Sequence, residues 1–235
     1  MLTHTEAQIY LGSHRGCTVS EGFRSFLTLN FGKYSSEGRQ PFGRLVAFNE
    51  QTLAAGKSTE LTITKPTEIV LLPIAGGLEL VDIYGESTFV SSGESFHFLA
   101  FPESSFSIIN PYAEETINYL EIHFYPDLSV NAFDTILDRS PLTVFSLDKQ
   151  NVLIPIFSRV GEKARGFLGQ YGGRMEDEFE MKSPERGIFV FIVQGAFEVQ
   201  NRLLEKGDAL SLLYLETLEF EALSEGAIIL VVEVG

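Results

Sequence analysis

The sequence predicts an all-β fold made of two antiparallel barrels or jelly-roll sandwiches, joined by a short helical connector. Two observations predict it. Short runs rich in β-branched and aromatic residues recur about every 8 to 12 residues, and glycine-containing turns separate them. This rhythm occurs twice, and between residues 126 and 145 it gives way to apolar side chains at helical spacing.

The chain of 235 residues is long enough for two barrels of roughly 100 to 120 residues each. We expect a first barrel in residues 1–125, a helical connector in 126–145 and a second barrel in 146–235. The strands expected in the first half are residues 60–64, 68–74, 78–84, 87–90, 95–101, 105–110 and 117–125. Those expected in the second half are residues 166–171, 179–182, 187–194, 197–200, 209–214, 218–222 and 227–234.

Composition and charge exclude several classes of function. The net charge is −15, so no basic surface is expected to attract nucleic acid or an anionic membrane. The longest apolar runs, such as residues 69–75 and 227–232, are far shorter than the roughly 20 residues of a membrane helix. Cys17 is the single cysteine, and residues 1–10 lack the pattern of a secretory signal. We therefore expect a cytoplasmic location.

One spacing resembles the metal-binding motif of cupin barrels. Gly56 is followed after five residues by Thr62-Ile63-Thr64, then after three residues by Glu68 and later by a glycine pair. In cupins a His-x-His pair stands at the two threonine positions, because alternate residues of a strand point into the same cavity. Threonine hydroxyls are weak ligands for iron, copper, nickel or zinc. The spacing thus indicates a cupin barrel whose usual metal ligands are missing.

Three further segments resemble the pirin family. Residues 22–34 (GFRSFLTLNFGKY) are similar to the opening signature of pirins, and residues 42–50 (FGRLVAFNE) to the block that follows it. Residues 187–207, with the turn VQG at 193–195, fit the second pirin barrel. The resemblance implies two cupin barrels, the first holding one metal ion, usually iron, through three histidines and one glutamate. Some pirins are quercetin dioxygenases, and others are redox-sensing regulators or partners of other proteins.

The ligands that the resemblance implies do not carry over to this chain. The first two positions fall on Thr62 and Thr64, and the second pair falls near Phe106 and Ile108. The histidine of the opening signature is Leu27. In the second half the same spacing reaches Phe179 and Met181, where we expect a packed core without a site. No metal site and no cofactor are therefore predicted at the family positions.

The remaining candidates are polar residues on predicted strands. Tyr119, Glu121 and His123 alternate along one strand and share a face, so they could line a cavity. The alternative is a solvated face or a seam between the barrels. Glu68 could act as a general base once burial raises its pKa, or it could be a strand-edge charge paired with Lys65.

The four histidines could also rebuild a displaced metal site. His97 alternates with Phe96 and Phe98 and should face away from them. His4 and His14 lie in the N-terminal segment, where a solvated role is expected.

Our hypothesis from the sequence is a metal-free pirin-like bicupin that binds a small apolar or aromatic ligand, or acts in regulation through contacts with another protein. The residues expected to line the ligand cavity are Thr62, Thr64 and Glu68, with Tyr119, Glu121 and His123 as secondary candidates. Two enzymatic alternatives remain. One is a quercetinase-like dioxygenase with its metal displaced to His97 or His123, and the other is a metal-independent acid/base enzyme using Glu68 and a histidine such as His123.

Overall fold

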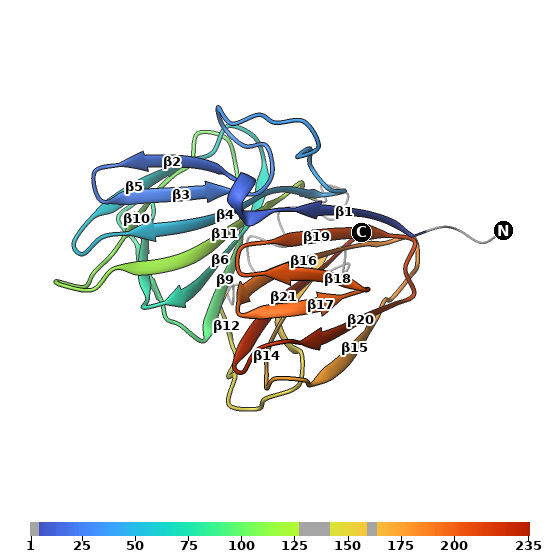
Figure 1. Ribbon diagram of the computed structural model, residues 1–235. Coiled ribbons are helices and arrows are strands. Elements are labelled where there is room, and N and C mark those ends of the chain that lie inside the picture. Colours follow the sequence, from blue (N-terminus) through green and yellow to red (C-terminus); the bar gives the residue numbers. More distant parts are fainter. Residues whose placement is uncertain (1–4, 127–141, 159–163) are drawn as a thin grey trace. The chain divides into compact units, whose positions relative to one another are not determined.

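The computed structural model describes residues 5–126, 142–158 and 164–235. The chain divides into two compact units: Gly16–Val144 forms the N-terminal unit, and Met1–Arg15 together with Phe145–Gly235 forms the C-terminal unit. Strands make up most of the described residues (Figure 1), and the helical element among them is the short 3-10 helix η1 (Gly12–His14). No helix in the described part of the chain is long and apolar enough to cross a membrane.

The N-terminal unit consists of two antiparallel sheets. The larger sheet has the order β12 (Leu142–Val144), β9 (Glu94–Ala100), β6 (Thr67–Ala75), β11 (Ile117–Phe124), β4 (Leu45–Leu53), β3 (Phe23–Leu27) and β2 (Gly16–Ser20). The smaller sheet has the order β5 (Ser58–Thr62), β10 (Ser105–Ile109), β7 (Leu78–Val81) and β8 (Ser87–Val90). Apolar side chains from both sheets form one core, so the unit is a jelly-roll sandwich.

The turn between β6 and β7 shows why glycines separate these strands. Gly76 has a φ of +75°, a left-handed conformation that glycine adopts at little cost. A Cβ on the neighbouring Gly77 would lie 2.4 Å from the Phe89 ring of β8. The glycine pair therefore allows both the reversal of the chain and the close approach of β8.

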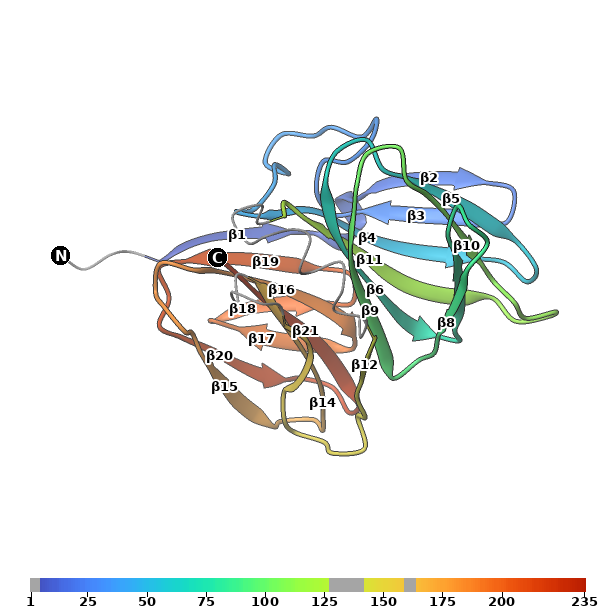
Figure 2. The ribbon, with the colours of Figure 1, turned by 180° about the vertical axis from the view of Figure 1, so that it is seen from behind.

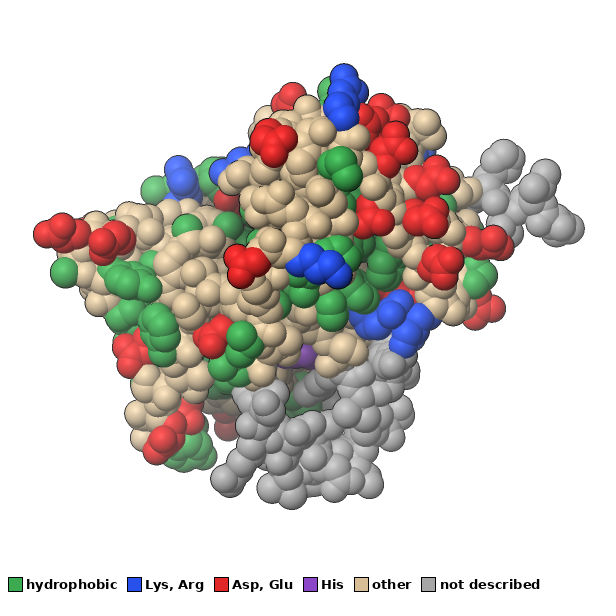
Figure 3. Space-filling model, turned by 90° about the horizontal axis from the view of Figure 1, so that it is seen from below, with side chains coloured by type: hydrophobic (Ala, Val, Ile, Leu, Met, Phe, Trp, Pro, Cys, Tyr) green, Lys and Arg blue, Asp and Glu red, His purple; other side chains and the backbone are tan. Residues whose placement is uncertain are grey.

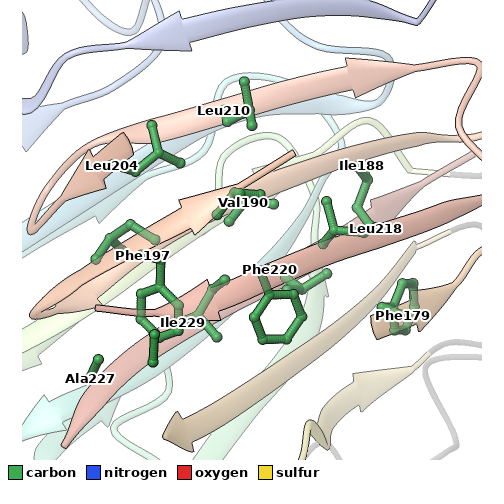
Figure 4. Close-up of a cluster of buried hydrophobic side chains, with 14 of the residues drawn as sticks. Phe179, Ile188, Val190, Phe197, Leu204, Leu210, Leu218, Phe220, Ala227 and Ile229 are labelled. Carbon is green, nitrogen blue, oxygen red and sulfur yellow. The ribbon is translucent and has the colours of Figure 1, made fainter. Parts of the chain in front are cut away.

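The C-terminal unit repeats this plan. Its larger sheet has the order β1 (Glu6–Tyr10), β19 (Ala209–Leu213), β16 (Gly187–Gln194), β21 (Ala227–Val234), β14 (Ala164–Tyr171) and β13 (Ile154–Ser158). Its smaller sheet has the order β15 (Glu176–Glu180), β20 (Thr217–Ala222), β17 (Ala196–Val199) and β18 (Arg202–Glu205). Figure 4 shows the core between the two sheets, where Phe197 and Phe220 lie among aliphatic side chains of β16, β19 and β21.

The N-terminal strand belongs to the C-terminal unit, which differs from the boundary expected from the sequence. Figures 1 and 2 both show β1 beside β19, and the two strands pair in an antiparallel register from Glu6 opposite Leu213 to Tyr10 opposite Ala209. The Tyr10 hydroxyl lies 3.2 Å from Ser211 Oγ, and the Gly12 amide donates to Asp208 Oδ1 at 2.6 Å. Residues 6–15 therefore complete the second sandwich, and the first begins at Gly16.

The fold class expected from the sequence is confirmed: the chain is all-β with two antiparallel jelly-roll sandwiches. In each unit the two sheets remain separate and do not close into a barrel. Most of the helical connector predicted for residues 126–145 lies outside the described residues, and its described end, Leu142–Val144, is strand β12 paired with β9.

Candidate functional site

The strand register of the N-terminal unit separates an inward from an outward face of the larger sheet. Ile69 and Leu71 of β6 belong to the core cluster, together with Tyr119 of β11. Because directly opposite residues of paired strands point to the same side, every second residue of β4, β6, β9 and β11 faces this interior. Glu121 and His123 alternate with Tyr119 along β11 and so point inward as well.

Five polar side chains lie together on this inward face, and we call them the polar patch. They are Asn49 and Gln51 of β4 and Tyr119, Glu121 and His123 of β11. Tyr119 is directly opposite Gln51, and Glu121 is directly opposite Asn49. All five are buried, and Asn49 and Tyr119 are completely so. The polar triplet expected from β11 therefore faces the interior of the sandwich, away from any solvated surface.

Several hydrogen-bonding atoms of the polar patch have no partner. Gln51 Nε2 donates to Glu121 Oε2 at 3.4 Å. Among the described residues, neither side-chain atom of Asn49 makes a hydrogen bond, and the same holds for Gln51 Oε1 and the Tyr119 hydroxyl. Buried polar atoms are almost always paired, with protein, ordered water or ligand. The patch therefore has the hydrogen-bonding capacity to hold water or a polar ligand.

Glu121 and His123 are the charged part of the polar patch. His123 Nε2 lies 2.9 Å from Glu121 Oε1, and both side chains are about one-twentieth exposed (5% and 6%). The two atoms are close, but their orientation does not make a hydrogen bond, so Nε2 has no hydrogen-bond partner within the described part of the chain. The Phe31 ring meets the imidazole edge-on, with centroids 5.2 Å apart. The Phe31 ring thus lies beside an imidazole that is itself close to the Glu121 carboxylate.

Tyr119 stays protonated in this environment. Burial raises the pKa of its phenol well above the ordinary value, and the negative charge of Glu121 raises it further. A neutral phenol can both donate and accept a hydrogen bond. Tyr119 can therefore form a hydrogen bond with either a donor or an acceptor atom of a ligand.

Glu68 and His97 form a second buried contact, on the opposite face of the same sheet. Glu68 Oε1 lies 2.7 Å from His97 Nε2, and the side chains are 8% and 7% exposed. Val70, the direct partner of His97 in the register, shares its outward direction. His97 therefore faces away from Phe96 and Phe98, as predicted. The Glu68 carboxylate pairs with a histidine instead of Lys65, and it does not join the polar patch.

Thr62 and Thr64 do not line the interior, which corrects the expectation from the motif spacing. Both threonines are exposed, whereas the neighbouring Leu61 and Ile63 are buried in the core cluster. A shift of one residue along a strand exchanges its two faces. The motif spacing matched the right region but assigned its side chains to the wrong face.

The donor set in this interior does not fit the metal site that the pirin resemblance implies. The smaller sheet offers apolar side chains there: Leu61, Ile63 and Ile108 belong to the core cluster, and Phe106 packs against it. The polar patch supplies one carboxylate and one imidazole, and the described residues contain no group of three or more His, Cys, Asp or Glu side chains placed to hold a metal. We therefore derive no chemical step through a metal ion.

The other positions considered from the sequence are accounted for. Phe179 is in the C-terminal core and Met181 packs against it, as predicted for that half. His14 is exposed at the end of η1, and His4 lies outside the described residues. Asn49 and Gln51 were missed, because they stand in the polar run Asn49–Thr52 of β4, where no alternation marks one face. Only the pairing of β4 with β11 shows that they join Tyr119 and Glu121.

A hollow of the C-terminal unit lies elsewhere and has a different character. It occupies about 600 Å³ on the smaller sheet, and its lining includes Glu176, Glu178, Glu219 and Glu221. Glu176 is directly opposite Glu221, and Glu178 is directly opposite Glu219. This open, acidic hollow lacks the buried, unpaired atoms of the polar patch, so we take the patch as the candidate site.

Comparisons with known proteins agree with this architecture. Residues 160–234 match the family model described as the quercetinase C-terminal cupin domain. No curated protein matches the sequence. YhhW from Escherichia coli is similar in structure, with a TM-score of 0.80, 16% sequence identity and 98% of both chains covered. Bacterial pirin YhhW in complex with nickel(II), also from Escherichia coli, gives a TM-score of 0.78 at 16% identity, covering 97% of this chain and 99% of that one.

A quercetin 2,3-dioxygenase from Acinetobacter baumannii is also similar, with a TM-score of 0.70, 12% identity, and 98% of this chain and 78% of that chain covered. At these identities the structural likeness establishes the fold. Residues 160–234 therefore match a quercetinase-type C-terminal cupin domain, and the two-cupin fold of the whole chain is similar to that of a bacterial pirin and a quercetin 2,3-dioxygenase.

Proposed function

We propose that this bicupin binds a small aromatic molecule carrying hydroxyl or carbonyl groups, and that the polar patch of its N-terminal cupin holds this molecule without a resident metal. The observation that carries the proposal is the set of buried, unpaired hydrogen-bonding atoms on Asn49, Gln51 and Tyr119. An unpaired buried amide is costly, and a ligand that pairs with it removes this cost.

The chemistry of the polar patch indicates the class of ligand. Asn49 offers both a donor and an acceptor, Gln51 an acceptor, and Tyr119 a hydroxyl that does either. The Phe31 ring beside His123 and the apolar core next to Tyr119 favour a flat, apolar body. A polyhydroxylated aromatic compound combines these features. Quercetin is such a compound, and the relative from Acinetobacter baumannii is named for it.

Calorimetric titration of quercetin into the purified full-length chain tests the proposal. We expect saturable binding by the wild type and loss of binding in Asn49→Leu, which removes both unpaired atoms. Thr62→Val is the matched control, because Thr62 is exposed and outside the interior, and it should bind as the wild type does. Equal binding by Asn49→Leu and the wild type would exclude the polar patch as the site.

An acid/base enzyme is the second candidate, and the contact between Glu68 and His97 favours it. A carboxylate 2.7 Å from an imidazole nitrogen is an arrangement that can transfer a proton. Both side chains are largely buried, so this function also requires a path by which a substrate can reach them from the surface. Glu68→Gln leaves the polar patch intact, so loss of a catalysed reaction without loss of quercetin binding would favour this function.

The proposal also covers location and partners. We place the protein in the cytoplasm, where its single cysteine, the exposed Cys17, would remain reduced.

Figure 3 shows one face of the molecule, on which acidic side chains are spread widely and basic ones are few. With a net charge of −15, the chain has no charge-driven affinity for nucleic acid or anionic membranes. A protein partner remains an alternative role of the same fold, in keeping with a regulatory function.

A further inference from the structure

The interior of the C-terminal cupin has a charged group at one end, formed by Arg165, Arg186 and Glu233. Arg165 of β14 is directly opposite Glu233 of β21. Glu233 alternates with the core residues Ile229 and Val231, so it points into the sandwich, and it is completely buried. Arg186 immediately precedes β16, whose Ile188 is also opposite Glu233. Two guanidinium groups therefore converge on one buried carboxylate.

The Glu233 carboxylate already accepts hydrogen bonds from Lys182 and Arg165. Glu233 Oε1 accepts the Lys182 backbone N–H at 3.0 Å. Glu233 Oε2 accepts a hydrogen bond from Arg165 Nε at 2.6 Å and is also in contact with Arg165 Nη2. Arg186 Nη1 is 3.6 Å from the same oxygen, which is beyond hydrogen-bonding distance. Arg165 thus forms the hydrogen-bonded ion pair, and Arg186 makes a longer charge contact with the same carboxylate.

Arg165 is held firmly in place. Its guanidinium carbon lies 5.3 Å from the centroid of the Phe167 ring and 5.6 Å from that of Phe179, both within the range of a cation–π contact. With Glu233 on one side and two aromatic rings on the other, this guanidinium is preorganised. Arg186, in contrast, makes no hydrogen bond to Glu233.

Arg186 shares its negative partner, Glu233, with Arg165. Its side chain is 18% exposed, and Nη1 is buried without a hydrogen-bond partner among the described residues. Two arginines against one glutamate leave a net charge of about +1. A largely buried guanidinium that shares one carboxylate with a second arginine, and makes no hydrogen bond to it, is only partly compensated, and an anion would complete the compensation.

We propose that this end of the C-terminal cupin binds an organic monocarboxylate, with Arg186 as the principal ligand-binding residue. The planar fork of a guanidinium matches a carboxylate through two parallel hydrogen bonds. A single net positive charge is balanced by a monoanion and would be exceeded by a dianionic phosphate. The half-buried Phe167 and Met181 at the core edge provide apolar contact for the rest of the molecule. The site lies in the other cupin from the polar patch, so it goes beyond the function proposed above.

Calorimetric titration of the full-length protein with sodium benzoate tests the proposal, and benzamide serves as the neutral probe of equal shape. We expect benzoate to bind and benzamide not to bind. Arg186→Gln should weaken benzoate binding by about tenfold or more, which is the loss of a charge-assisted hydrogen-bonded pair. Arg186→Lys keeps the charge without the fork and should weaken binding less, and it serves as the probe of the site if Arg186→Gln fails to fold.

Two control variants test whether the loss of benzoate binding is specific to Arg186. Arg174→Gln makes the same charge change in the same unit at an exposed side chain (80%), and it should leave benzoate binding unchanged. Asn49→Leu should also leave it unchanged, so failure of the function proposed above does not affect this test. Equal binding of benzoate and benzamide, unchanged binding in both Arg186 variants, or tighter binding of inorganic phosphate than of benzoate would each overturn the proposal.

Discussion

Two buried asparagines in the N-terminal unit allow a direct test of the polar patch through stability. Asn49 and Asn110 are both completely buried, but only Asn110 has its amide paired. Asn110 Nδ2 donates to the Leu53 and Glu115 carbonyls at 2.9 and 2.8 Å, and Asn110 Oδ1 accepts the Tyr112 N–H at 3.0 Å. Replacing each asparagine with leucine, which has a similar branched shape, should therefore change stability in opposite directions.

The magnitudes follow from the hydrogen bonds. Asn110→Leu removes three bonds worth about 0.5 to 1.5 kcal/mol each, so it should lower the free energy of unfolding by about 2 to 4 kcal/mol. Asn49→Leu removes a buried amide whose atoms have no partner in the described part of the chain, and it should raise that free energy by about 1 to 3 kcal/mol. Because Asn49 has no hydrogen-bond partner among the described residues, its replacement by leucine leaves none of their hydrogen-bonding groups unpaired.

Chemical denaturation with urea, in the absence of ligand, measures both changes. The two variants alter the same unit, so the transition that moves down in Asn110→Leu is the one that should move up in Asn49→Leu. A loss of stability in Asn49→Leu equal to that in Asn110→Leu would refute the reasoning. It would mean that Asn49 is fully paired in the native protein and has a structural role.

Three further predictions concern stability. Burial raises the pKa of Tyr119 above its ordinary value of 10.0, and burial followed by the hydrogen bond to Asp177 raises that of Tyr171. The folded state thus holds these protons more tightly, so stability should fall as pH rises above about 10, and the absorbance of tyrosinate should show both phenols ionising only with unfolding. Phe197→Ala removes a fully buried ring packed against Tyr171 and should cost about 3 to 5 kcal/mol by urea denaturation; a loss below about 1 kcal/mol would contradict the packing. Tyr10→Ala should destabilise the C-terminal unit and leave the N-terminal transition in place, and a shift of the N-terminal transition alone would contradict the assignment of β1.

Much of the fold could be predicted from the sequence, because strand signals are local. The run at residues 87–90 coincides with β8 (Ser87–Val90), and the run at 117–125 ends one residue beyond β11 (Ile117–Phe124). The partner of a strand is not a local property. Nothing in residues 6–10 indicates that they pair with β19, some 200 residues later, because backbone pairing depends on where the rest of the chain brings its sheet edge.

The candidate site could be predicted only in part. Alternation along one strand correctly placed Tyr119, Glu121 and His123 on one face, because a strand has a fixed period of two. The threonine assignment failed for the same reason, since a shift of one residue at Thr62 and Thr64 reverses inside and outside. Asn49 and Gln51 became visible only through the register between β4 and β11, which connects positions about 70 residues apart.

The most direct test of the central claim is calorimetric titration of quercetin into protein whose metal content has been measured, first stripped of metal and then offered iron, nickel, copper, manganese or zinc. We predict binding by the metal-stripped protein at one molecule per chain, with an affinity that none of the metals changes. Binding that appears only with a retained, stoichiometric metal would contradict the account. It would move the site to a metal centre that includes His97 or His123.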